Sequence, residues 1–305
     1  MKIISSKFGQ FYEIDSDVPE VLRSGLNQIP GVHLGDNSWR LPIISKIRRA
    51  LSRNGYEVPE REWKTCECPE IFRPFQKEAV EFIENNGRAL IAMDTGLGKT
   101  AVALHYLRLH PELRPAVVVC NSAVKYQWID ELRKWGDWRS ESVQVINGTT
   151  PGFGFGTFLT INYDILAHHV DMLKKIKPKV VIFDEVQKIK NPLSKRGKSA
   201  QVFREVEKVI CLSGTPIENR PAEFWNMLSI LRPDIFYNRG WFHNRFCGPK
   251  MVMGEVQYKG SSNERELHEL LTDTVLYRKK KDDPDVEKYM PDKEVIPVSF
   301  DIDTK

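Results

Sequence analysis

Short apolar runs alternate with amphipathic stretches along the middle of the chain. Runs rich in Val, Ile and Ala predict strands that are buried on both faces, and the amphipathic stretches between them predict helices. The predicted strands are Ala89 to Met93, Ala116 to Asn121, Val143 to Ile146, Val180 to Asp184 and Val209 to Ser213. The predicted helices are Gln76 to Asn85, Thr100 to Leu109, Val124 to Trp135 and His169 to Ile176. From Phe72 to Leu231 this alternation predicts an α/β fold, a parallel sheet flanked by helices.

The first 62 residues follow a different pattern. The elements predicted there are a strand at Phe11 to Ile14, a short helix at Pro19 to Ile29, a strand or hairpin at Val32 to Pro42, and a helix from Ile43 to Arg53 that ends at Asn54-Gly55. Together they predict a small amino-terminal α+β module over residues 1–62. The polar stretch Pro59 to Lys64 is the predicted linker to the rest of the chain.

After Ala222 the predicted strands stop. Glu223 to Leu231 and Glu264 to Thr272 predict helices, and the charged segment Arg278 to Asp285 continues this helical excursion over about residues 222–290. Val295 to Asp301 predicts a new strand close to the carboxyl end. We therefore expect the main domain to span residues 63–297 and residues 298–305 to begin a second lobe.

Composition narrows the class of protein. Apolar residues make up 41% of the 305 residues, which excludes disorder as the main state. The 45 basic and 41 acidic residues give a net charge of +4, which permits an anionic partner without requiring one. No apolar run is long enough to span a bilayer, the amino terminus is too polar for a secretory signal, and five scattered cysteines fit reduced thiols. We expect an intracellular protein without a membrane partner, cytoplasmic in a phage or bacterium and nuclear in a eukaryote.

The most informative stretch follows the strand that begins at Ala89 and opens the next helix. Its residues are Asp94, Thr95, Gly96, Leu97, Gly98, Lys99 and Thr100. Gly96 and Gly98 allow the backbone to curl so that its N–H groups and the helix amino terminus face an anion. Lys99 is then expected to reach the β- and γ-phosphates of ATP, and the Thr100 hydroxyl to bind Mg²⁺. Met93 replaces the first glycine of the general phosphate-loop pattern, and a plain glycine turn is the alternative.

An acidic pair ends another buried strand. Asp184 is expected to hold Mg²⁺ through its hydration shell, and Glu185 to orient or deprotonate the attacking water. Together with Lys99 these are the predicted catalytic residues. Two carboxylates at the end of a strand can also form an ordinary solvated turn. The catalytic interpretation therefore requires Lys99 and Asp184 to face one cavity.

Two further features flank the phosphate loop and the acidic pair along the chain. Gln76 lies ahead of the phosphate loop, and its carboxamide has the donor and the acceptor needed to read an adenine edge. Leu212-Ser213-Gly214-Thr215-Pro216 ends the last predicted sheet strand. Each feature is common when taken singly, and their order carries the information.

In that order the motifs resemble the first motor lobe of the Swi/Snf-type ATPases of helicase superfamily two, which are ATP-driven translocases on double-stranded DNA. The resemblance covers Phe72 to Val298. Ser213 to Phe236, Tyr258 to Asn263 and Tyr277 to Lys281 are similar to the HARP-like annealing-helicase branch, which remodels forks and rewinds strands. The resemblance implies a RecA-like sheet, ATP and Mg²⁺ as cofactors, and double-stranded or forked DNA as a partner.

The resemblance also implies roles for other residues. Gln187 stands where the family usually has His, and with Ser213, Gly214 and Thr215 it is expected to couple the nucleotide site to DNA. The positions implied as DNA contacts are Ser122, Lys125, Trp128, Asn162, Tyr163, and Lys188 and Lys190 in the loop up to Lys195. Lysine and hydroxyl side chains suit phosphate contacts. For Trp128 a place in the core is the favoured alternative, and for the basic run Arg278 to Lys281 a solvated face is an equal one.

The amino-terminal module has two open interpretations. Between Asp36 and Glu57 it carries Arg40, Lys46, Arg48, Arg49 and Arg53 without an acidic residue, and Trp39 to Pro42 resembles the small DNA-recognition domain of annealing helicases. Arg48 and Arg49 are therefore candidate DNA contacts. A stabilising or partner-binding cap is the alternative.

A complete motor of this family places arginines from its second lobe across ATP, and the Gln-x-x-Gly-Arg-x-x-Arg pattern is absent from these 305 residues. We expect the chain to need a second RecA-like lobe and to turn ATP over slowly without it. Two other functions are open, a non-catalytic DNA-binding scaffold and an RNA helicase. The stretch Cys120 to Val124 and the Ser-Gly-Thr form of the third motif argue against the RNA helicase.

Overall fold

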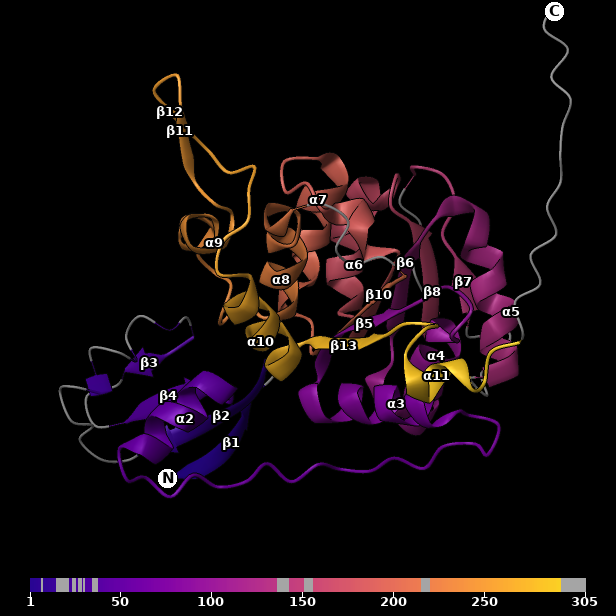
Figure 1. Cartoon of the computed structure of the whole chain (residues 1–305). Helices are drawn as coiled ribbons and strands as arrows, with labels where there is room; N and C mark the ends of the chain where they lie inside the picture. The colour runs from indigo at the N-terminus through magenta and orange to yellow at the C-terminus, as the bar shows by residue number, and fades with distance from the viewer. Residues whose placement is uncertain are drawn as a thin grey trace, which may run out of the picture.

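The computed structural model describes residues 1–6, 8–14, 22–23, 26, 29, 31–34, 38–135, 143–150, 156–214 and 220–291. Its centre is a seven-stranded parallel sheet in the order β13-β5-β10-β9-β6-β8-β7 (Figure 1). The strands are β5 Arg88–Met93, β6 Ala116–Cys120, β7 Val143–Val145, β8 Phe158–Asn162, β9 Val180–Asp184, β10 Lys208–Ser213 and β13 Leu276–Lys279. The predicted α/β fold with a RecA-like sheet is confirmed.

Alternation along the strands explains how the sheet is covered on both faces. In β5 the side chains of Ala89, Ile91 and Met93 join one apolar cluster, and those of Leu90 and Ala92 join the other. Successive side chains in a strand point to opposite faces, so a continuous apolar run needs a layer on each side. One layer contains α3 Pro74–Asn86, α4 Lys99–Leu109 and α5 Lys125–Trp135. The other contains α6 Val170–Ile176, α7 Lys195–Ala200, α8 Trp225–Leu231 and α10 Glu264–Thr274.

The sequence interpretation needs correction at two strands of this sheet. The segment Leu276–Lys279, predicted to be part of the helical excursion, is the edge strand β13 and pairs in parallel with β5. Strand β8 was not predicted, although it lies between β6 and β7. The excursion also holds α9 Arg239–Phe246, the short α11 Pro284–Glu287, and a hairpin of β11 Lys250–Val252 and β12 Glu255–Gln257 that projects from the body (Figure 1).

The amino-terminal segment forms its own small sheet. Four antiparallel strands follow the order β1-β2-β4-β3, with bounds Lys2–Ser6, Gly9–Ile14, Trp39–Pro42 and His33–Leu34, and α2 Ser45–Arg53 follows them. Most of the predicted helix at Pro19 to Ile29 lies outside the described residues, as does the predicted strand at Val295 to Asp301. Within the described part of the chain, no helix is long and apolar enough to cross a bilayer.

The small sheet and the predicted linker both contact the large domain. The hydrophobic cluster that contains Tyr12 and Leu41 continues into the large domain at Phe236. In the linker, the Lys64 amide donates to Asn85 Oδ1 on α3 (2.8 Å), and Asn85 Nδ2 donates back to the Lys64 carbonyl (2.8 Å). The stretch predicted as a linker therefore lies along α3 as part of the folded structure.

The amino terminus of α2 is capped from the large domain. Asp273 on α10 accepts hydrogen bonds from the Ser45 amide (2.7 Å) and the Ser45 hydroxyl (3.0 Å), whereas Ile44 at the N-cap supplies no side-chain bond. The first amides of a helix have no partner within the helix, and a carboxylate there also interacts favourably with the helix dipole. A side chain of the large domain thus accepts a hydrogen bond from the first backbone amide of a helix in the small one.

We predict that Asp273→Ala lowers the free energy of unfolding by about 1 to 2 kcal/mol, because it removes a charged helix cap. Urea denaturation at neutral pH measures the change. Asp282→Ala removes the same charge from an exposed position and should be close to neutral. Equal losses in the two variants would show that the cap contributes nothing specific.

Candidate nucleotide site and the adjoining basic pocket

The predicted phosphate loop joins the end of β5 to the start of α4. Gly96 and Gly98 have φ angles of +89° and +86°, in the left-handed region that glycine adopts without strain. Gly98 is the N-cap of α4, and a β-carbon on it would overlap the Gln76 carboxamide. The loop therefore needs glycine at Gly98 for both its conformation and its packing.

Gln76 is hydrogen-bonded to this loop. Its Nε2 donates to the Leu97 carbonyl (3.0 Å), and its Oε1 accepts from the Arg73 amide (2.8 Å). Each of the two atoms keeps one further hydrogen-bonding position, which an adenine edge could use. Gln76 therefore fixes the loop and also retains the chemistry predicted from the sequence.

Lys99 and Asp184 carry opposite charges in a partly buried setting. The Lys99 ammonium donates to the Met93 carbonyl (2.8 Å) and, at 3.4 Å, to the Asp94 carbonyl, and burial lowers the pKa of Lys99. Burial also raises the pKa of Asp184, although the Trp128 indole N–H donates to Asp184 Oδ2 (3.0 Å) and opposes that rise. Both shifts disfavour the charged form of the side chain. A ligand that brings an opposite charge to each group would therefore stabilise the charged forms.

The two charged groups line one cavity, as the sequence interpretation requires. It has a volume of about 490 Å³ and is lined on one side by α5 residues. The other side is lined by Thr95, Gly96, Gly98, Lys99 and Thr100 of the loop. Asp184 and Glu185 complete the lining. The strand ends that carry the loop and the acidic pair lie at the same edge of the parallel sheet, where such folds bind ligands.

A chain of side-chain hydrogen bonds leads from the acidic pair to the last sheet strand. Ser213 Oγ donates to Gln187 Oε1 (3.0 Å), and Gln187 Nε2 donates to Glu185 Oε2 (2.6 Å). A β-carbon on Gly214 would lie 3.1 Å from Thr95 Oγ1, so this turn closely approaches the phosphate loop. The contact between Gln187 and Ser213 is the one that a coupling role requires, and Thr215 lies outside the described residues.

Several residues that the sequence suggested as DNA contacts are buried. The exposed fractions are 5% for Lys125, 6% for Asn162 and 2% for Tyr163. The Lys125 ammonium donates to the Ile146 carbonyl (3.0 Å), and the Tyr163 hydroxyl donates to the Asp184 carbonyl (2.7 Å). These partners give the side chains a place in the core, so they are poorly available to DNA.

Trp128 has a role that the sequence did not reveal. It is 2% exposed, which agrees with the favoured core placement, yet its indole N–H reaches the cavity and orients Asp184. The two residues are 56 positions apart. No local signal in the sequence could have identified this pair.

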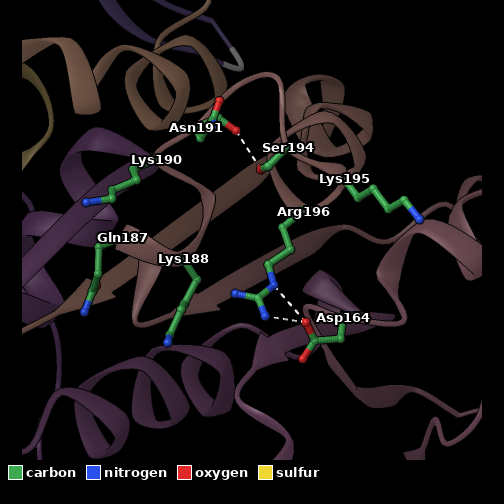
Figure 2. A pocket seen from close by; sticks show the side chains of 8 residues that line it. All are labelled: Asp164, Gln187, Lys188, Lys190, Asn191, Ser194, Lys195 and Arg196. Carbon is green, nitrogen blue, oxygen red and sulfur yellow. Dashed lines mark hydrogen bonds and ion pairs between the residues drawn. The ribbon is translucent and has the colours of Figure 1, made fainter.

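A second cavity, of about 460 Å³, adjoins the hydrogen-bond chain at Gln187 (Figure 2). It is lined by Asp164, Gln187, Lys188, Lys190, Asn191, Ser194, Lys195 and Arg196. Arg196 Nε donates to Asp164 Oδ1 (2.8 Å), and Lys190 forms an ion pair with Glu223 (3.1 Å). We call this cavity the basic pocket, because four of its eight lining side chains are cationic and one is acidic.

The module residues Arg48 and Arg49 form ion pairs within the protein. Arg48 pairs with Glu60 (3.0 Å), and Arg49 pairs with Glu269 on α10 (2.9 Å). All of these groups are partly exposed, so the pairs contribute little stability individually. DNA that bound here would have to replace both carboxylate partners.

The sequence is similar to a known protein family and to named members of it. A family profile described as "SNF2-related domain" matches residues 75–305. The "SWI/SNF-related matrix-associated actin-dependent regulator of chromatin subfamily A-like protein 1" of Xenopus laevis is 34% identical over 211 residues, 68% of this chain and 22% of that protein. The "DNA annealing helicase and endonuclease ZRANB3" of Homo sapiens is 30% identical over 220 residues, 68% of this chain and 20% of that protein. The chain thus spans about a fifth of the length of these relatives.

A solved structure has the same fold. The Sulfolobus solfataricus SWI2/SNF2 ATPase core, determined in complex with dsDNA, superposes with a TM-score of 0.60 and 23% identity. The likeness covers 77% of this chain and 49% of that one.

We predict that Asp184→Asn raises the thermal unfolding midpoint at pH 8. Burial raises the pKa of Asp184, so ionising it costs more free energy in the folded chain than in the unfolded one. Asparagine removes this cost and keeps an oxygen that can accept the Trp128 bond.

The sign of this effect is tested by scanning calorimetry over a pH series. The penalty exists where the carboxylate is ionised, so the advantage of the variant should shrink as the pH is lowered and the wild-type carboxyl becomes protonated. Asp171→Asn, at an exposed position on α6, is the matched control. A lower midpoint for Asp184→Asn at pH 8 would contradict the prediction.

Proposed function

The chain belongs to the SNF2-related family, and on that premise we propose that it is the first motor lobe of an ATP-dependent translocase on double-stranded or forked DNA. The observation that carries the proposal is the cavity shared by Lys99, Asp184 and Glu185 at one edge of the sheet. The fork-remodelling or strand-annealing type is favoured because one relative is named a DNA annealing helicase. The dsDNA-bound ATPase core with the same fold supports the choice of substrate.

We also propose a division of the chain into parts. Residues 1–62 are an accessory module, and residues 63–297 are the motor lobe, with a largely helical protrusion that begins at about residue 222 and ends before strand β13. In a complete motor a second RecA-like lobe would close on the ATP cavity. We propose such a lobe as the partner of this one, with residues 298–305 at its start.

The residues lining the cavity suit ATP. Lys99 would bind the β- and γ-phosphates, and its buried setting strengthens attraction to an anion because little water screens the charges. The amides of Thr95, Gly96 and Gly98 would surround the phosphates at the amino terminus of α4. Asp94, Leu97 and Gln76 would hold the loop in shape, and Gln76 would also contact adenine.

The same residues fit Mg²⁺. The Thr100 hydroxyl and the Asp184 carboxylate are oxygen donors, and Mg²⁺ in such sites takes one or two protein ligands together with water and substrate phosphates. When bound, the ion would neutralise negative charge on the phosphates. Asp184 is ready for this role because Trp128 fixes one of its oxygens.

Glu185 would handle the attacking water. Gln187 donates to Glu185 Oε2, and the other carboxylate oxygen, Oε1, would accept a proton or orient water. Because Gln187 also accepts from Ser213, a shift of that strand end would change the orientation of the Glu185 carboxylate. Gln187, Ser213, Gly214 and Thr215 are therefore the proposed coupling residues.

DNA would approach the basic pocket. Lys188 and Lys195 line it, and Lys190 and Arg196 add charge that Glu223 and Asp164 partly neutralise. Lysine ammonium groups suit backbone phosphates and carry no sequence information. Gln187 lines the pocket and bonds to Glu185, so a phosphate held here would lie beside the residue that positions the water. Ser122, which begins a short helical turn after β6, and the pair Arg48 and Arg49 stay predicted DNA contacts.

We predict that Lys99→Ala weakens binding of a fluorescent ATP analogue about 10- to 100-fold, because it removes a charged hydrogen bond to phosphate. Glu185→Gln should keep binding and lower turnover about 10²- to 10⁴-fold, because it removes the general base. Binding is measured on the 305-residue chain. Turnover is measured on a chain extended by the second lobe, with and without duplex DNA. Equal inactivity of wild type and Glu185→Gln would favour the non-catalytic scaffold.

We predict that Lys188→Glu combined with Lys195→Glu weakens duplex-DNA binding at least 10-fold and flattens its salt dependence, because each lost phosphate contact lowers the log-log slope by about 0.9. Fluorescence anisotropy over a salt series measures both effects. Lys174→Glu with Lys175→Glu on α6 makes the same charge change away from the basic pocket. Equal losses of DNA affinity in the two double variants would show that the effect comes from net charge and not from the basic pocket. Tighter binding of single-stranded RNA than of duplex DNA would favour the RNA helicase.

A further inference from the structure

The segment that follows α10 returns to the nucleotide loop. Strand β13 pairs in parallel with β5 so that Lys279 lies opposite Met93, the residue at which β5 ends. Just beyond, the Asp94 amide donates to the Lys279 carbonyl (3.1 Å), and Asp94 Oδ2 accepts from the Lys281 amide (2.9 Å). These two bonds, here called the Asp94 clasp, join the first residue of the phosphate loop to the last residue of β13 and to Lys281.

The clasp places the Lys281 side chain beside the loop. A β-carbon built on Gly96 would lie 3.9 Å from the Lys281 ammonium. Gly96 itself lines the nucleotide cavity. Lys281 is exposed, and within the described part of the chain its ammonium has no carboxylate partner. The residue two positions earlier differs, because Lys279 forms ion pairs with Glu78 (3.2 Å) and Asp285.

The platform that carries Lys281 is well packed. The Tyr277 hydroxyl donates to the Phe75 carbonyl (2.7 Å) at the start of α3, and Val286 on α11 is fully buried in the core beneath it. Tyr289 lies against Phe75, with ring centroids 6.3 Å apart. Lys281 therefore stands between two anchored elements, and less conformational freedom is lost when it binds a ligand than for a lysine on a mobile loop.

Charge balance indicates the kind of ligand that would fit. Lys281 and Lys99 both reach the phosphate loop, because the Lys281 ammonium would lie 3.9 Å from a β-carbon on Gly96 and the Lys99 ammonium donates to the Met93 carbonyl (2.8 Å). Two ammonium groups near one loop repel each other, and an anion with several negative oxygens between them converts repulsion into attraction. A polyphosphate on the backbone amides of the loop is such an anion.

We propose that Lys281 is a further nucleotide-binding residue, whose ammonium contacts a phosphate of the bound nucleotide from the Gly96 side of the loop while the Asp94 clasp holds its backbone in place. This inference rests on the proposed ATP site and adds a residue to it. The alternative is that the run from Arg278 to Lys281 is a solvated face.

The test is titration of the 305-residue chain with fluorescent ATP, ADP and AMP analogues. Lys281→Ala should weaken ATP binding about 10-fold, ADP binding less and AMP binding hardly at all, because the lost contact is to the outer phosphates. Lys281→Arg should restore most of the affinity. Lys280→Ala, one position earlier and equally cationic, is the matched control and should bind all three like wild type.

The outcomes separate this inference from the proposed function. If the wild-type chain binds ATP and Lys281→Ala binds it as tightly as Lys280→Ala does, the inference is wrong and the nucleotide site stands. If the wild-type chain binds no nucleotide, the proposed function is wrong and the inference falls with it. An equal loss for ATP, ADP and AMP would also overturn it, since that result indicates a general effect on the fold. Thermal midpoints of all variants identify such an effect independently.

Discussion

The arrangement of this lobe depends on two opposite charges that are partly buried at one edge of a parallel sheet. Burial shifts the pKa values of Lys99 and Asp184 so that the neutral form of each is favoured. Hydrogen bonds oppose this effect and stabilise the charged forms: Lys99 donates to the Met93 carbonyl, and the Trp128 indole donates to Asp184. Transfer of a charge into a poorly solvated site is costly unless it is paired. A ligand that brings both negative phosphates and a cation offsets that cost at both groups. Burial of the two charges therefore lowers the stability of the ligand-free protein, and the same burial would strengthen the binding of a ligand that pairs with both.

Gln187 connects Glu185, the neighbour of Asp184, to the basic pocket. Its carboxamide bonds to Glu185 on one side and to Ser213 on the other, and its side chain also lines the basic pocket. An imidazole can bridge two partners only in the correct tautomer or when protonated, whereas a carboxamide always has both a donor and an acceptor. The glutamine that replaces the usual histidine therefore preserves the bridge and makes it independent of pH near neutrality.

The parts of the site that could be predicted from sequence are those formed by local interactions. A run such as Ala89 to Met93 predicts a buried strand wherever it lies, and two glycines before Lys99 predict a phosphate loop because few other residues adopt those angles. The parts that were missed depend on distant partners. Strand β13 has the sequence LYRK, which carries no strand signal, and it is a strand because β5 offers a free edge and α3 binds its tyrosine and lysine. Likewise Lys125 and Tyr163 look like surface residues until carbonyl groups 21 positions away satisfy them.

The order of the strands explains why the phosphate loop has contacts with neighbouring segments on both of its sides. Strand β5 lies between β10 and β13, and all three strands run in the same direction, so the residues that follow each of them emerge together. On one side Gly214 approaches Thr95 and leads to the hydrogen-bond chain through Ser213. On the other side Asp94 holds Lys281. The loop is thus in contact with residues more than 60 positions apart in the chain, Gly214 and Lys281. A shift in the loop must change the contacts of both neighbours, because parallel pairing fixes their register.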